Sequence, residues 1–274
     1  MPATPNPPAF EAAVREYLEP SKDQFNYEQM LLTFLSVDRF RQWAAVVDRY
    51  RPVAGARFLS SGCGFAGSLL AYRDAGAASA VGVEVDEEYV RFGRLRVAEL
   101  AGAEVRGYDG GRLPFAEDSF DVIESMDVIE HTPDDLAYVR ELARVLAPGG
   151  LILLVTPNRL WPVEQHLGIA GPPWLPVGVA DTLFGALARL PLLSADRRFR
   201  YRKLRGMRTQ NVSLRRLRAI AKDCGLFLRV LRPEDHGADW PLPMDPAWVR
   251  RLRDTRLGKF LAPTRTLVVT LQHG

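Results

Sequence analysis

Residues 57–67 read RFLSSGCGFAG, a short predicted strand followed at once by three glycines with the spacing GxGxxG. Glycine lets the backbone turn sharply and approach a ligand closely, and the N-terminus of the helix that follows favours negative charge. Glu84 comes 22 residues after the first glycine, at the end of the next predicted strand. A carboxylate there can accept hydrogen bonds from both hydroxyls of a ribose. The pattern therefore favours a nucleoside-type cofactor over a purely structural tight turn.

Strands and helices alternate from this loop onward. Strands are predicted at 57–60, 80–84, 105–108, 120–125, 151–156, 226–231 and 264–271, and helices at 68–75, 86–100, 134–146 and 213–223. The strand at 151–156 is almost entirely apolar, as expected for the buried centre of a parallel sheet. The alternation predicts the α/β class, with a Rossmann-like, doubly wound, seven-stranded sheet.

The rest of the chain suggests how this domain is covered. Residues 1–8 carry four prolines and are expected to be a disordered leader. Residues 9–50 are expected to form helices at about 9–19 and 27–50 that cover the cofactor or acceptor. The main domain is predicted to run over 51–274. The alternation breaks between about 158 and 212, which we interpret as an insertion after the fifth strand that forms a lid.

Composition narrows the function further. The net charge of +3, from 36 basic and 33 acidic residues, is too balanced to indicate nucleic-acid binding. Neither Cys63 nor Cys224 belongs to a CxxC or Cys/His cluster, so no metal is expected. The chain shows no signal-peptide pattern and no apolar run of membrane-spanning length, which favours a cytoplasmic location. The oligomeric state cannot be inferred from these features.

Four further motifs follow the glycine loop in order: DGGRLPF at 109–115, DSFDVI at 118–123, DVIEH at 127–131 and VLAPGG at 145–150. With the glycine loop they resemble the class I S-adenosylmethionine-dependent methyltransferases, specifically the branch that contains ubiquinone-biosynthesis-type O-methyltransferases. The resemblance covers about 57–158. An NAD(P)-dependent oxidoreductase fits the glycine loop and Glu84 equally well, but it has no reason to carry the later motifs, so it remains a distant alternative.

The resemblance implies S-adenosylmethionine as the cofactor and assigns roles to individual residues. Asp109 accepts a hydrogen bond from the adenine amino group, and the backbone of the glycine loop contacts the methionine end of the cofactor. Ser125 and Met126 lie under the sulfonium. The implied cofactor-binding set is Ser61, Gly62, Cys63, Gly64, Glu84, Val85, Asp109, Gly110, Ser125 and Met126.

The chain departs from the family pattern at Ser60, where an acidic residue usually precedes the glycine loop. That acid often orients the loop or meets the ammonium group of the cofactor. Serine can still form hydrogen bonds but carries no charge, so the ammonium contact must come from elsewhere. Tyr27 and the region around Asp38, both in the N-terminal helices, are the candidates.

Methyl transfer is an in-line displacement, to which an enzyme contributes alignment and sometimes a base. His131 follows the fourth strand and His166 lies just beyond the carboxyl end of the fifth, the edge at which open α/β sheets bind ligands. Either histidine is a candidate base, although His131 also suits a structural helix start and His166 a satisfied loop position. The expected acceptor contacts are Asn158, Trp161, Glu164 and Trp174.

An apolar segment at 177–193 precedes seven cations within residues 197–208. Three interpretations stay open: a solvated face, an interfacial segment over 177–208 that touches an anionic membrane, or a binding site for a phosphate or carboxylate group of the acceptor. The sequence thus predicts methyl transfer to oxygen, nitrogen or carbon of a small metabolite or of a lipid-linked or glycan acceptor. The alternative is a non-catalytic module that binds S-adenosylmethionine.

Overall fold

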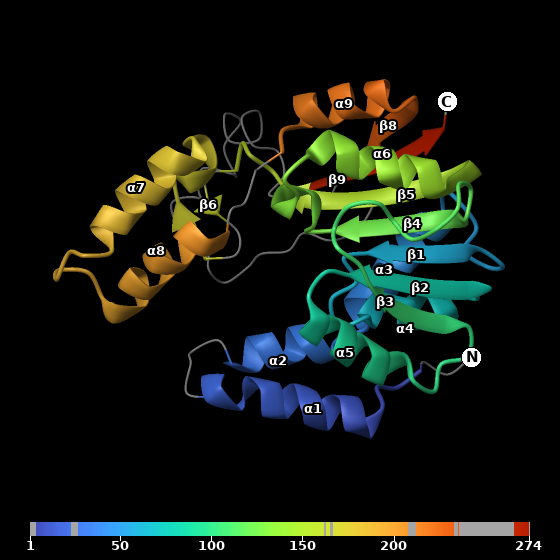
Figure 1. Ribbon diagram of the computed structural model, residues 1–274, viewed down its shortest axis with the longest axis horizontal. Coiled ribbons are helices and arrows are strands. Elements are labelled where there is room, and N and C mark those ends of the chain that lie inside the picture. Colours follow the sequence, from blue (N-terminus) through green and yellow to red (C-terminus); the bar gives the residue numbers. More distant parts are fainter. Residues whose placement is uncertain are drawn as a thin grey trace.

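A seven-stranded mixed sheet with the strand order β3-β2-β1-β4-β5-β9-β8 forms the centre of the computed structural model (Figure 1). The structure describes residues 4–22, 27–161, 163–164, 167–207, 212–232, 235 and 266–273. The strands are β1 (Arg57–Ser61), β2 (Ser79–Glu84), β3 (Ala103–Gly107), β4 (Phe120–Met126), β5 (Leu146–Pro157), β8 (Leu226–Val230) and β9 (Thr266–His273). The predicted Rossmann-like, seven-stranded α/β sheet is confirmed.

The sheet is parallel from β3 to β5, and only its edge departs from that pattern. Strand β9 runs antiparallel to both β5 and β8, which makes the sheet mixed. Strand β5 begins earlier than predicted because Leu146 pairs with Phe120. The chain changes direction across the sheet between β1 and β4, which lie side by side, so a switch point falls where such sheets bind ligands.

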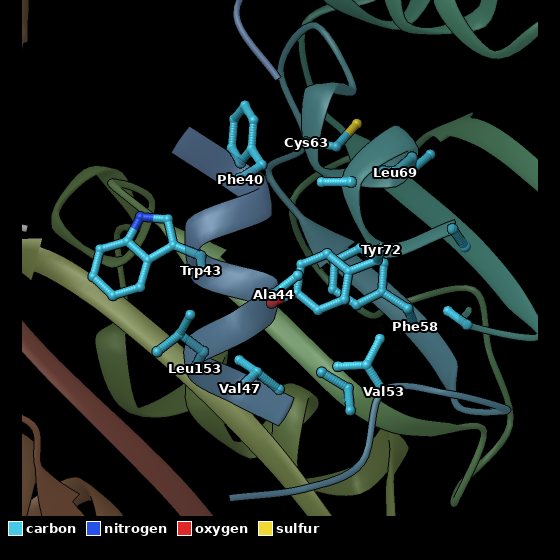
Figure 2. Packing of buried hydrophobic residues seen from close by; sticks show 14 of the residues in the cluster. Phe40, Trp43, Ala44, Val47, Val53, Phe58, Cys63, Leu69, Tyr72 and Leu153 are labelled. Atoms are coloured by element: carbon cyan, nitrogen blue, oxygen red, sulfur yellow. The ribbon is translucent and has the colours of Figure 1, made fainter. Parts of the chain in front are cut away.

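Helices cover both faces of this sheet: α4 (Gly67–Asp74) and α5 (Glu87–Val97) on one face, α6 (Asp135–Val145) and α9 (Leu214–Asp223) on the other (Figure 1). Alternate residues of β1 enter the two cores, Phe58 on one side and Leu59 on the other, as the two-residue period of a strand requires. Figure 2 shows Phe58 against Tyr72, with their ring centroids 3.6 Å apart.

The N-terminal segment forms α1 (Pro8–Leu18), α2 (Tyr27–Leu35) and α3 (Asp38–Asp48). Helix α3 packs on the core through Phe40, Trp43, Ala44 and Val47 (Figure 2). The helix predicted over 27–50 is therefore broken between α2 and α3. The break turns the carbonyl of Leu35 toward a buried arginine, Arg96, which donates to it at 2.8 Å.

The expectation of a disordered leader over residues 1–8 is wrong for residues 4–8. The hydroxyl of Thr4 donates to Asp74 at 2.6 Å, and the amide of Asn6 donates to the carbonyl of Leu35 at 2.8 Å. Pro8 is the first residue of α1, a position that proline tolerates because its missing N–H would have no partner inside the helix. These contacts hold the segment to the domain.

The insertion after β5 contains the short strands β6 (Val163–Glu164) and β7 (Ile169–Ala170) and the helices α7 (Val177–Leu187) and α8 (Ala195–Met207). The two helices form a hairpin that extends away from the sheet (Figure 1). Phe184 of α7 meets Tyr201 of α8 edge-to-face, with centroids 5.1 Å apart. Over the described ranges, no helix combines the length and the apolar character needed to cross a membrane.

Candidate active site

The glycine loop between β1 and α4 leaves little room for side chains. Gly62 has φ +73°, and a Cβ at this position would collide with Cγ2 of Val128. Gly64 also has positive φ, at +50°. Both the conformation and the close approach of Val128 therefore require glycine at position 62.

Glu84 ties the end of β2 to this loop. Its Oε2 accepts a hydrogen bond from the N–H of Gly64 at 2.9 Å, and its Oε1 accepts one from the N–H of Val85 at 2.7 Å. The residue is only 8% exposed. The carboxylate is thus held beside the glycine loop, in the place expected for a ribose-binding acid.

A cavity of about 470 Å³ opens at this edge, among β1, β2, β4 and helices α2 to α5. Of the predicted cofactor-binding residues it is lined by Gly62, Cys63, Gly64, Glu84, Val85 and Met126, and the candidate base His131 lines it as well. Most of the predicted loop residues and the ends of β2 and β4 thus line one cavity.

The side chains of Ser61 and Ser125 do not face this cavity, contrary to the prediction. Both are fully buried on the other side of the sheet, where the hydroxyl of Tyr138 in α6 lies 2.8 Å from Oγ of Ser125 and donates to Oγ of Ser61 at 2.9 Å. Because side chains alternate along a strand, their neighbours Ser60 and Glu124 face the cavity instead.

Glu124 is the cavity residue that sequence reasoning missed. It pairs with Ser60 in the β1–β4 register and is 2% exposed. Burial raises the pKa of Glu124 to about 7, against the opposing effects of the Ser68 hydroxyl and the charge of Arg39. The two-residue period counted back from Met126 was the signal that could have found it.

The N-terminal helices reach the cavity through residues other than those expected. Tyr27 begins α2 and packs with the aromatic side chains around Phe65. Asp38 points outward, with its side chain 84% exposed, and forms a salt bridge to Arg41 at 2.7 Å. Neither matches the expected ammonium contact. Instead, Arg39 and Phe40 of α3 line the cavity.

Arg96 of α5 joins this helical cover to the glycine loop. The guanidinium donates to the carbonyls of Phe65 in the loop and of Phe34 in α2, both at 3.0 Å, and to Oδ1 of Asn6 at 2.9 Å. Arg96 is 2% exposed, and burial lowers its pKa to about 9. One buried side chain thus holds the loop and the helices that wall the cavity.

Asp109 and Gly110 follow β3 in a tight turn. Oδ1 of Asp109 accepts from the N–H of Gly111 at 2.9 Å. A Cβ on Gly110 would lie 3.4 Å from Cγ1 of Val85, so this turn lies against the end of β2. Its position suits an adenine contact, which stays a prediction.

The predicted acceptor residues cluster in the first part of the insertion, outside the lining of the cavity. Asn158, Trp161 and Glu164 are buried, and the indole of Trp174 is 54% exposed while donating to the carbonyl of Leu160. Glu164 accepts from the N–H of Leu167 at 2.7 Å. His166 lies outside the described residues. The acceptor role of this group therefore remains a prediction.

Comparison with known proteins agrees with this geometry. Residues 59–154 match the family model described as a methyltransferase domain. The match covers the glycine loop, Glu84 and the strands that form the cavity. The chain belongs to the class I S-adenosylmethionine-dependent methyltransferases.

Individual relatives fall within the same class. The chain is 36% identical over 177 residues to a ubiquinone biosynthesis O-methyltransferase of Ruegeria pomeroyi. This alignment covers 58% of the chain and 70% of the relative. The chain is also 36% identical over 138 residues to the enzyme of the same name from Parvibaculum lavamentivorans, covering 48% of this chain and 53% of that protein. The chain thus spans about half the length of this second relative.

A solved S-adenosylmethionine-dependent methyltransferase from Mesorhizobium loti shares the fold, with a TM-score of 0.55 and 18% identity. The superposition covers 87% of this chain and all of that one. At this level of identity the likeness concerns the fold alone.

The residues of the cavity fit S-adenosylmethionine. The volume of the cavity lies within the range of small-molecule sites. Glu84 suits the ribose, and Oε2 of Glu124 is a buried acceptor without a hydrogen-bond partner among the described residues. Over the same residues, no group of three or more His, Cys, Asp or Glu is placed to hold a metal ion.

Proposed function

We propose that this chain transfers the methyl group of S-adenosylmethionine to a small-molecule acceptor. The observation that carries the proposal is the shared cavity: the glycine loop and Glu84 line the same hollow as Met126 and His131. A donor held by the first set would present its methyl group close to the second. Donor and acceptor would thus meet at the carboxyl edge of the sheet.

The cofactor, when bound, supplies a methyl group on a positively charged sulfur. The chain contributes position and surroundings: Glu84 and the loop orient the nucleoside, while Met126 and Phe40 present apolar surface that limits water. His131 stands at the cavity with an exposed side chain. In the proposal it accepts the proton that an acceptor hydroxyl loses as the new bond to carbon forms.

Oxygen is the first acceptor atom to test, because the relatives are named O-methyltransferases. Nitrogen and carbon remain open. The test is incubation with S-adenosylmethionine and a panel of phenols, amines and sugar hydroxyls, with product and S-adenosylhomocysteine measured by mass spectrometry. Turnover that persists in EDTA supports the metal-free reaction that we propose.

His131→Gln separates a chemical role from a structural one. Loss of turnover that is reversed at high pH, where the acceptor ionises without help, supports the role as base. Turnover unchanged by the substitution contradicts that role. Cofactor binding without product across the whole panel favours a non-catalytic module, and failure to bind S-adenosylhomocysteine at all contradicts both functions.

We further propose that the α7–α8 hairpin contacts an anionic membrane surface, which suits a lipid-linked acceptor and a cytoplasmic protein. The loop between the helices exposes Leu190 (44%) and Leu192 (94%). Beside it, a hollow of about 630 Å³ is lined by Arg189, Arg198, Tyr201 and Arg202. Apolar side chains at a projecting tip, flanked by guanidinium groups, match the apolar and charged layers of a lipid interface.

Flotation with vesicles of phosphatidylcholine and phosphatidylglycerol tests this contact. We expect binding that weakens when Arg189→Glu and Arg198→Glu are combined, and that weakens separately in Leu192→Asp. Arg91→Glu, an exposed cation on α5, is the matched control. Flotation that is equal for all variants, or absent altogether, contradicts the membrane contact and favours a solvated face.

A further inference from the structure

Ser60 and Glu124 form a polar pair deep in the cavity. They are direct neighbours across β1 and β4, and they are 3% and 2% exposed. The hydroxyl of Ser68 donates to that of Ser60 at 3.0 Å, and Oε2 of Glu124 has no hydrogen-bond partner among the described residues. Burial of an unpartnered carboxyl oxygen is costly unless a ligand satisfies it.

A cation of α3 lines the same part of the cavity. Arg39 stacks over the ring of Phe40, with its guanidinium carbon 4.4 Å from the ring centroid. Its Nε is buried and has no hydrogen-bond partner among the described residues. The cavity therefore presents a carboxylate and a guanidinium group that both have unused hydrogen-bonding capacity.

The separation between this pair and Glu84 matches the length of one amino-acid moiety bonded to a ribose. Strands β2 and β4 flank β1, so Glu84 and Glu124 lie two strand spacings apart, about 9 to 10 Å across the sheet. In the register Glu124 is level with Ser60 and Gly82, two residues before Glu84 along the strand direction, and it lines the cavity together with residues of α2 and α3. A ligand whose ribose meets Glu84 can extend toward Glu124 and Arg39.

We propose that Glu124 accepts the α-ammonium group of the cofactor's methionine moiety and that Arg39 binds its α-carboxylate. Glu124 thereby supplies, from β4, the negative charge that Ser60 lacks on β1. This inference rests on the proposed function, because it concerns the same cofactor. Opposite charges on the ligand satisfy both buried groups, and each contact is a charge-assisted hydrogen bond.

Protonation of Glu124 then controls cofactor affinity. Burial raises the pKa of Glu124 to about 7, so acidification through neutrality neutralises the carboxylate that the ammonium group requires. The groups that face it are Arg39 from α3, Tyr72 from α4 and Cys63 from the glycine loop. Burial raises the pKa of both Tyr72 and Cys63, which keeps those two neutral.

Binding calorimetry with four ligands tests the assignment group by group. The ligands are S-adenosylhomocysteine, its analogue without the α-carboxylate, its analogue without the α-ammonium, and 5′-methylthioadenosine, which lacks both. Glu124→Gln is expected to weaken the two ligands that carry the ammonium by about 10- to 100-fold and to leave the others unchanged. Arg39→Met is expected to weaken only the two that carry the carboxylate.

Glu84→Gln is the matched control, because it replaces another buried carboxylate in the same cavity. We expect it to weaken all four ligands alike, since all share the ribose. Equal weakening of all four by Glu124→Gln indicates a structural effect and overturns the proposal, as does no weakening. If wild-type protein binds no ligand, the proposed function fails as well, which distinguishes the two failures.

The pH dependence gives a second readout. Wild-type affinity for S-adenosylhomocysteine is expected to fall as pH decreases from 8 to 6, and Glu124→Gln is expected to flatten that profile. His131 lines the same cavity, so the series is repeated in His131→Gln. A profile that stays steep in Glu124→Gln but flattens in His131→Gln overturns the role of Glu124.

Discussion

Helices α1 and α2 and the α7–α8 hairpin both extend beyond the carboxyl edge of the sheet, yet they are held in different ways (Figure 1). The helices are anchored to the domain by Arg96, by the Thr4–Asp74 hydrogen bond and by a salt bridge from Arg41 to Asp74 at 2.9 Å. The hairpin is held by its own small core, which includes Phe184 and Leu204 of α7 and α8.

This difference separates two parts of the proposed reaction. The cover that walls the cofactor cavity shares hydrogen bonds with the glycine loop, so it is expected to unfold only with the domain. The hairpin packs mainly on itself and exposes apolar residues, so it is expected to open at lower free energy. The walls of the cofactor cavity are thus part of the folded domain, while the α7–α8 hairpin is a nearly separate unit.

Removing the anchor of the N-terminal cover should have the largest effect. Arg96→Met leaves the buried carbonyls of Phe34, Leu35 and Phe65 without their donor, and we expect a loss of about 3 to 5 kcal/mol in the free energy of unfolding. Urea denaturation measures it, with the exposed Arg91→Met as control. A loss no larger than in the control would show that the cover is not anchored here.

The free energy of unfolding should also depend on pH, through the carboxyl group of Glu124. Burial raises the pKa of Glu124 from its ordinary value of 4.5 to about 7, so the folded state binds more protons between these values. Stability should therefore fall as pH rises from about 4.5 to 7, by roughly 3 kcal/mol at most. Glu124→Gln should remove that decline, measured as thermal unfolding of the free protein from pH 4 to 8. Parallel profiles for the two proteins would contradict it.

Crowding at the glycine loop provides the third test. Gly62→Ala places a methyl group against Val128 at a positive φ, and we expect a loss of roughly 1 to 3 kcal/mol together with weakened S-adenosylhomocysteine binding. Calorimetry and urea denaturation measure the two effects. Unchanged binding in a folded variant would show that the loop tolerates a displacement, and that the cavity is not formed by this turn.

The smallest effect is expected in the hairpin, with the opposite sign. Gly185 lies inside α7, and a Cβ built there meets nothing within 4 Å. Gly185→Ala should stabilise α7 by about 0.5 to 1 kcal/mol, because alanine restricts the unfolded chain. Hydrogen exchange of α7 amides measures the local gain, and global unfolding should stay unchanged. Global stabilisation would show that hairpin and domain unfold together.

Features that depend on neighbours along the chain were predicted well. The strands, the glycine loop and Glu84 follow from short-range patterns, because hydrophobic period and glycine spacing reflect local backbone geometry. The motifs did not indicate which face of a strand each residue occupies. Ser61 and Ser125 were assigned to the cofactor, although the two-residue period turns them toward Tyr138.

The sequence by itself determined the α/β class, the glycine loop and the acid at the end of β2, because each is encoded within a few consecutive residues. Only the tertiary structure decided that Glu124 lies beside Ser60, that Arg39 meets them from α3, and that Arg96 holds the helical cover. Those pairings join residues far apart in the chain. They depend on strand register and helix packing, which local patterns do not specify.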